Sequence, residues 1–175
     1  LTLPGILDRV ADRPVMLVAA AVLTLALAVL AGITATMAQG LPSWHVLLIG
    51  WVVLGIAYSA SVTPSGRLLR RSANPEDRPA LFAAQFALSH VCWLICYPLV
   101  GQLGARVGMT AAFGGMAVAA AVGTIAALRL WPANDPDVIA HEHGDLAADD
   151  EHRQQHATSD HAFVIDRRHA QWPKQ

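Results

Sequence analysis

Four stretches of this chain are apolar and uncharged over lengths that can cross a lipid bilayer. They cover residues 15–35, 45–66, 79–103 and 107–128, and none contains Asp, Glu, Lys or Arg. A hydrocarbon core of about 30 Å needs about 20 helical residues, and a chain inside it must bond its backbone amides within the helix. The pattern therefore predicts an all-α integral membrane protein with four transmembrane helices.

Charge divides the chain into two parts. Residues 1–132 carry eight arginines and four acidic residues, whereas residues 133–175 carry nine acidic residues, four basic residues and six of the eight histidines. The second part has too little apolar surface to build a core. We expect a membrane domain over 1–132 and a largely disordered, acidic, His-rich tail over 133–175. Because the chain starts at Leu1 without Met, we also expect amino-terminal helices of the same protein to precede it.

The arginines predict how the spans are oriented. The turn before the first span and the connector after the second hold Arg9, Arg13, Arg67, Arg70, Arg71 and Arg78. The other two connectors hold only Arg106. Since cationic loops stay in the cytoplasm, we expect a multi-pass protein of the inner (plasma) membrane with a cytoplasmic carboxy terminus. Its surroundings would be membrane lipid, and no nucleic-acid partner is expected.

Small residues recur at every fourth position in the first and fourth spans. The rows are Ala20, Thr24, Ala28 and Gly32, and Ala111, Gly115, Ala119, Gly123 and Ala127. Rows of this kind allow two helix backbones to approach closely in lipid. We predict that they are packing faces; the alternative is that Ala and Gly are simply common in such proteins.

The third span has one polar face. Gln85, Ser89, Cys92 and Cys96 share a stripe that His90, Trp93 and Tyr97 flank, and the opposite arc is apolar. A polar or ionisable side chain at membrane depth is costly unless it faces a cavity or a partner. We therefore expect a substrate or proton pathway along Gln85, Ser89, His90 and Trp93, with Tyr58 of the second span.

The same residues also allow a purely structural interpretation. In that interpretation, His90 is a neutral imidazole that bonds a carbonyl of a neighbouring helix. Cys92 and Cys96 are then packing residues, not soft metal ligands. Pro64 and Pro98 lie near the ends of the second and third spans, where each is expected to weaken its helix because proline lacks an amide donor.

The segment 3–14, LPGILDRVADRP, precedes the first span directly. It resembles the short cytoplasmic loop between the second and third helices of each half of major facilitator superfamily transporters. Asp8, Arg9 and Arg13 match that loop's pattern. Pro4 and Ala11 stand where the pattern has Gly, and Asp12 stands where it has a base.

The resemblance implies that the four spans are helices nine to twelve of a twelve-helix bundle. It implies a secondary active transporter, a permease that works by alternating access, in which Asp8, Arg9 and Arg13 form a gating loop. Arg13 could instead bond the last carbonyls of a neighbouring helix, and the alternative for all three residues is that they only set the topology of the chain. Nothing in the chain resembles a phosphate-binding loop, and we expect neither an enzyme nor a resident cofactor. The alternative is a non-transporting four-helix membrane anchor that presents a metal- or protein-binding tail.

The tail carries a second hypothesis. His141, His143, His152, His156 and His161 lie among carboxylates, a mixture that suits transition-metal ions. Export of divalent metal ions is therefore one expectation for the substrate, beside export of small molecules. The alternative for these histidines is a solvated tail that binds no metal.

Overall fold

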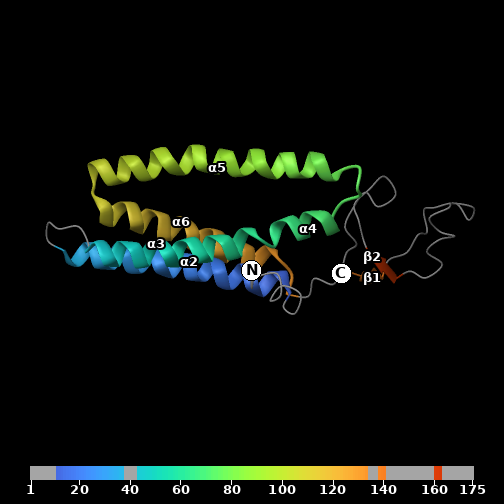
Figure 1. The fold of residues 1–175 in the computed structure, drawn as a ribbon, viewed down its shortest axis with the longest axis horizontal. Helices are drawn as coiled ribbons and strands as arrows, with labels where there is room; N and C mark the ends of the chain where they lie inside the picture. Colours follow the sequence, from blue (N-terminus) through green and yellow to red (C-terminus); the bar gives the residue numbers. More distant parts are fainter. Residues whose placement is uncertain (1–10, 38–42, 134–137, 141–159, 163–175) are drawn as a thin grey trace, which may run out of the picture. The chain divides into compact units, whose positions relative to one another are not determined.

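The structure is a computed structural model that describes residues 11–37, 43–133, 138–140 and 160–162. Along the chain (Figure 1) the elements are α2 (Asp12–Thr36), α3 (Trp44–Val62), α4 (Ser65–Arg71), α5 (Arg78–Arg106), α6 (Met109–Leu130), β1 (Val138–Ala140) and β2 (Asp160–Ala162). The chain forms two compact units, residues 1–65 with 85–133 and residues 66–84 with 134–175. Each unit is described by itself.

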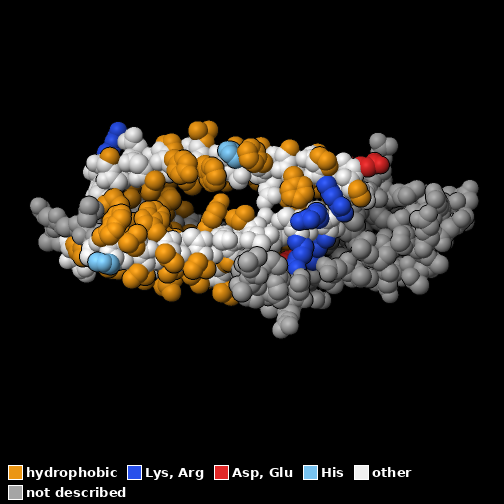
Figure 2. Space-filling view, in the orientation of Figure 1, with side chains coloured by type: hydrophobic (Ala, Val, Ile, Leu, Met, Phe, Trp, Pro, Cys, Tyr) orange, Lys and Arg blue, Asp and Glu red, His pale blue; other side chains and the backbone are white. Residues whose placement is uncertain are grey.

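Within the described ranges, four helical segments are long and apolar enough to cross a membrane. They are Asp12–Thr36, Trp44–Arg71, Arg78–Arg106 and Met109–Leu130. Large apolar side chains cover much of the outer surface of these segments (Figure 2). Apolar surface of this extent is stable in lipid and costly in water. The predicted all-α membrane fold is confirmed.

Single proline and glycine residues determine where some helices begin and end, which the apolar stretches alone do not indicate. The stretch 45–66 is interrupted, because α3 ends at Val62 and α4 begins at Ser65, with Pro64 buried between them. The last helix begins at Met109 because Gly108 adopts a φ of 109°, which other residues rarely reach. Pro98 does not end its helix: α5 continues through it to Arg106, as membrane helices often do.

The first unit is organised around α2, which packs against α6 and against α3. Figure 1 shows these three helices side by side. Two threonine pairs join α2 to α6. The Thr110 hydroxyl donates to the Thr34 hydroxyl over 3.1 Å, and the Thr24 and Thr124 hydroxyl oxygens are 3.4 Å apart. The pairs run in opposite order along the two helices, so α2 and α6 are antiparallel.

The two rows of small residues coincide with this interface only in part. Ala28 and Gly32 of α2 are exposed, and so are Ala119 and Gly123 of α6. A spacing of four residues turns by about 40° per step around a helix of 3.6 residues per turn. A long row of this period therefore rotates away from any single neighbouring helix, and these four residues do not pack between α2 and α6; whether they form packing faces stays a prediction.

An apolar groove of about 340 Å³ runs between α2 and α3. Leu30, which is buried, and Gly50 both line it. A Cβ atom on Gly50 would lie 3.2 Å from Leu30 Cδ2. The two backbones therefore approach closely here because residue 50 has no side chain.

The second unit contains most of α4, the start of α5 and the described part of the tail. The Asn74 carbonyl accepts hydrogen bonds from the amides of Asp77 and Arg78, which forms the turn before α5. β1 and β2 pair antiparallel, with Ile139 opposite His161. Two short segments of the tail therefore pair as antiparallel strands, and the rest of the tail predicted as disordered lies outside the described residues.

Candidate functional site

Helix α5 carries most of the side chains that the sequence places on a pathway. None of its residues is buried in the described structure. The large side chains Phe86, Trp93 and Tyr97 are 66%, 42% and 66% exposed. Its polar face therefore remains accessible along the membrane-spanning length of the helix.

Four rings follow one another along this helix. Phe86, His90, Trp93 and Tyr97, which we call the aromatic row, are spaced by four, three and four residues, so each lies about one turn from the next. Their successive ring centroids are 4.0, 4.9 and 6.2 Å apart, and neighbouring rings are tilted by 37° to 48°. The row is continuous over three turns of α5.

A hydrogen bond fixes the imidazole within the row. His90 Nδ1 lies 2.8 Å from the Phe86 carbonyl oxygen. A carbonyl oxygen only accepts, so Nδ1 carries the proton, and in the neutral ring Nε2 holds a lone pair. The bond is made to the carbonyl of its own helix four residues earlier, and not to a neighbouring helix.

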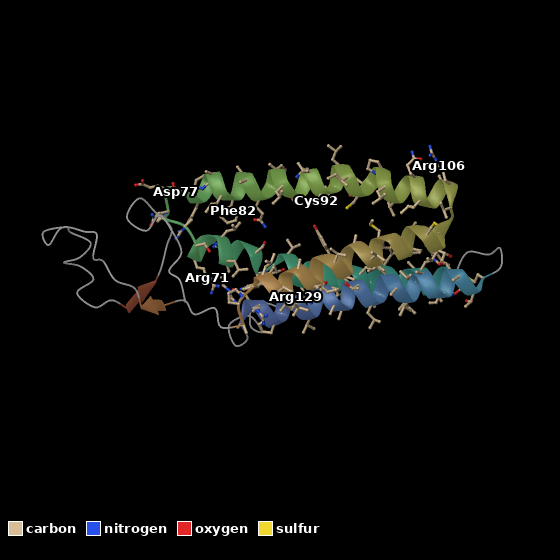
Figure 3. The ribbon with its side chains drawn as sticks, turned by 180° about the vertical axis from the view of Figure 1, so that it is seen from behind. Arg71, Asp77, Phe82, Cys92, Arg106 and Arg129 are labelled. Atoms are coloured by element: carbon tan, nitrogen blue, oxygen red, sulfur yellow. The ribbon has the colours of Figure 1, made fainter. Side chains whose placement is uncertain are left out.

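The polar stripe beside the row is only partly occupied by internal contacts. The Ser89 hydroxyl donates to the same Phe86 oxygen over 2.8 Å. Gln85 is half-buried, Cys92 is exposed and Cys96 is half-buried. Cys92 lies midway along α5 (Figure 3). The face thus presents hydroxyl, thiol and amide groups next to the rings.

Tyr58 lies on α3 and is 52% exposed. Among the described residues, no hydrogen bond or ring contact joins it to α5. The structure therefore brings together Gln85, Ser89, His90 and Trp93 on one helix face but does not add Tyr58 to them.

The gating loop is described only in part. Asp8 and Arg9 lie outside the described residues. Arg13, in the first turn of α2, donates from Nε to the main-chain oxygen of Trp131 over 3.2 Å. Trp131 is the residue at which α6 is capped, so this bond ties the start of α2 to the end of α6. Asp12 beside it is 8% exposed.

The metal hypothesis falls largely outside the described residues. His141, His143, His152 and His156 are not described. His161 lies in β2, opposite Ile139. Within the described residues no group of three or more His, Cys, Asp or Glu side chains is placed to hold a metal ion. Within those residues, no third His, Cys, Asp or Glu side chain is therefore placed to bind a metal ion together with Cys92 and Cys96.

Phe86 belongs to the aromatic row but was not predicted from the sequence, and Tyr97 was placed only on the flank of the polar stripe. Their positions at four before His90 and four after Trp93 were a usable signal. Aromatic side chains at this spacing meet along a helix face. Because apolar residues also fill the opposite arc, Phe86 could not be separated from lipid-facing residues by composition alone.

Comparison with known proteins identifies the family. A family model described as Major Facilitator Superfamily matches residues 3–164, which include all four membrane-spanning segments. No curated protein and no solved structure matches the chain. The four long apolar helices agree with part of a membrane bundle of that family. The chain therefore belongs to the major facilitator superfamily, whose members are multi-pass membrane transporters.

Proposed function

We propose that this chain is part of a secondary active permease that works by alternating access, with the polar face of α5 on its substrate pathway. The observation that carries the proposal is the sequence of polar and ring side chains from Gln85 to Tyr97 on a helix without buried residues. Polar groups at membrane depth are stable where they face a cavity or a partner. The family match supplies the transport function to which this face would contribute.

The contact between Arg13 and the Trp131 carbonyl would act at one end of this pathway. A cation near the last carbonyls of a helix is stabilising because the helix dipole is negative there. The bond joins the start of α2 to the end of α6 over 3.2 Å. With the arginine-rich segments in the cytoplasm, this end and the carboxy terminus face the cell interior. A reporter that works only in the cytoplasm should then be active when it is fused after Gln175, and a reporter that works only outside the cytoplasm should be inactive.

The test is transport by the full-length protein in cells that lack their own copy. A panel of drugs and of nickel, cobalt and zinc ions is screened for altered accumulation. We then compare Ser89→Trp, which fills the polar face, with Val91→Trp, about 200° away on the same helix. Loss of transport in the first variant alone supports the proposal.

Two outcomes would reject it. If no compound changes its accumulation, the chain is better explained as a membrane anchor that presents its tail. If both tryptophan variants transport normally, α5 does not line the pathway. Deleting residues 133–175 separately tests metal export, which requires that metal tolerance falls when the histidines of the tail are removed.

A further inference from the structure

The aromatic row has a chemical character that the transport function alone does not require. The rings of Phe86, Trp93 and Tyr97 each present a face of negative electrostatic potential. The His90 ring lies between them, with centroids 4.0 Å from Phe86 and 4.9 Å from Trp93. Four π systems thus follow one another along the same side of a membrane helix.

The hydrogen bonds beside the row leave lone pairs on this side. His90 Nδ1 and the Ser89 hydroxyl both donate to the Phe86 carbonyl oxygen, each over 2.8 Å. In the neutral imidazole, Nε2 is then an acceptor, and the Ser89 oxygen keeps its own acceptor capacity. With the imidazole neutral, these acceptor atoms have the same negative potential as the ring faces.

No fixed charge competes with this potential along the span. Residues 79–105 contain no Asp, Glu, Lys or Arg, and the arginines at residues 78 and 106 stand at the two ends of α5. Figure 3 shows Arg106 at the end that leads to α6. A cation over an aromatic face is attracted by the ring quadrupole, and more strongly once it is desolvated. An anion would find no fixed positive charge between the two ends.

We propose that the aromatic row binds a planar organic cation, stacked on Trp93 and Tyr97, with acceptors at His90 and Ser89 for any N–H group it carries. The inference rests on the proposed function, because the row is then a substrate-binding segment of the pathway. It names the substrate class as aromatic cations and distinguishes them from neutral and anionic molecules of the same shape. The competing occupant of this face is another helix of the protein.

The test measures binding to the full-length protein in nanodiscs of zwitterionic lipid. The probe is N-methylacridinium, and 9-methylanthracene and anthracene-9-carboxylate serve as neutral and anionic molecules of matched shape. We expect saturable binding of the cation and clearly weaker binding of the other two. Trp93→Leu should weaken cation binding about tenfold, which corresponds to about 1.4 kcal/mol, and Trp93→Phe should restore most of it. Trp51→Leu is the matched control, since Trp51 is an exposed tryptophan of α3.

Three results would overturn the proposal. The first is equal affinity for the cation and its neutral analogue. The second is an equal loss of affinity in Trp93→Leu and Trp51→Leu. The third is a fall in thermal stability of Trp93→Leu with unchanged cation binding, which would show that the row packs against a helix. A protein that transports another compound but does not bind N-methylacridinium refutes this inference alone. A protein that binds the cation but transports nothing refutes the proposed function and keeps the site.

Discussion

Arg13 Nε donates a hydrogen bond to the main-chain oxygen of Trp131 over 3.2 Å, which connects two residues 118 positions apart. Arg13 is half-buried in the first turn of α2. The acceptor is the carbonyl at the end of α6, where the helix dipole favours a positive charge. One side chain thus satisfies a helix end and fixes the packing of α2 on α6.

Replacing Arg13 by Gln is expected to destabilise the protein by about 1–2 kcal/mol, because the charge-assisted bond to the end of α6 is lost. Thermal unfolding in detergent measures the change. Arg106→Gln is the control, since Arg106 is an exposed arginine in the last turn of α5. Equal effects of the two substitutions would show that the loss of charge, and not this bond, determines stability.

The two threonine pairs between α2 and α6 should differ in strength. Thr24 and Thr124 each donate their one hydroxyl proton to a carbonyl of their own helix, Ala20 and Ala120. No proton then remains for the 3.4 Å contact between them. Thr34 also donates to its own helix but accepts from Thr110 over 3.1 Å, so only this pair is an interhelical hydrogen bond.

Double-mutant cycles with Thr→Val substitutions test this difference. We expect a coupling energy of about 0.6 kcal/mol for Thr34 with Thr110, the average for interhelical hydrogen bonds in membranes. Coupling between Thr24 and Thr124 should be near zero. A stronger coupling for the second pair would show that its hydroxyls turn toward each other.

Gly50 allows the close approach of α3 to α2. A Cβ atom at this position would lie 3.2 Å from the buried Leu30 side chain. Gly50→Leu should therefore cost about 1–3 kcal/mol of stability through overpacking. Gly55→Leu lies in the same helix, where a Cβ atom would meet nothing within 4 Å, and should not destabilise. The prediction is wrong if both variants unfold alike.

Gly108 is required by the turn between α5 and α6. With a φ of 109°, Gly108→Ala should cost about 1–3 kcal/mol because L-residues with a side chain are strained there. Gly101→Ala, inside α5 with open space around it, should instead stabilise by about 0.5–1 kcal/mol through lower backbone entropy in the unfolded chain. Opposite signs in urea or thermal unfolding are the expected result.

Hydropathy predicts the membrane helices well because crossing a bilayer requires long apolar segments with internal backbone bonding. Helix pairing is not predicted as well. The row from Ala20 to Gly32 turns away from α6, so Thr24 lies at the interface while Gly32 is exposed. On α6, Thr124 approaches Thr24 of α2 while its neighbour Gly123 in the row is exposed, a difference that a fixed period of four does not reveal.

The candidate site shows the same limit. Gln85, Ser89, His90 and Trp93 are predicted from the sequence because polar side chains stand out in an apolar span. Phe86 was not, since a phenylalanine in a membrane helix is equally suited to face lipid. The partner of His90 was also placed wrongly: its bond is to the Phe86 carbonyl of the same helix, a local geometry that residue types alone do not specify.

Chemical labelling tests directly whether α5 lines a pathway. All native cysteines of the full-length protein, Cys92 and Cys96 among them, are first replaced by serine. Ser89→Cys or Val91→Cys is then introduced and studied in intact membranes. A hydrophilic maleimide should label the first variant, on the polar face, and the aromatic cation should slow that labelling. Labelling of the second variant should be negligible, because Val91 lies on the apolar arc. Equal labelling of both positions, or faster labelling of Val91→Cys, would contradict the account.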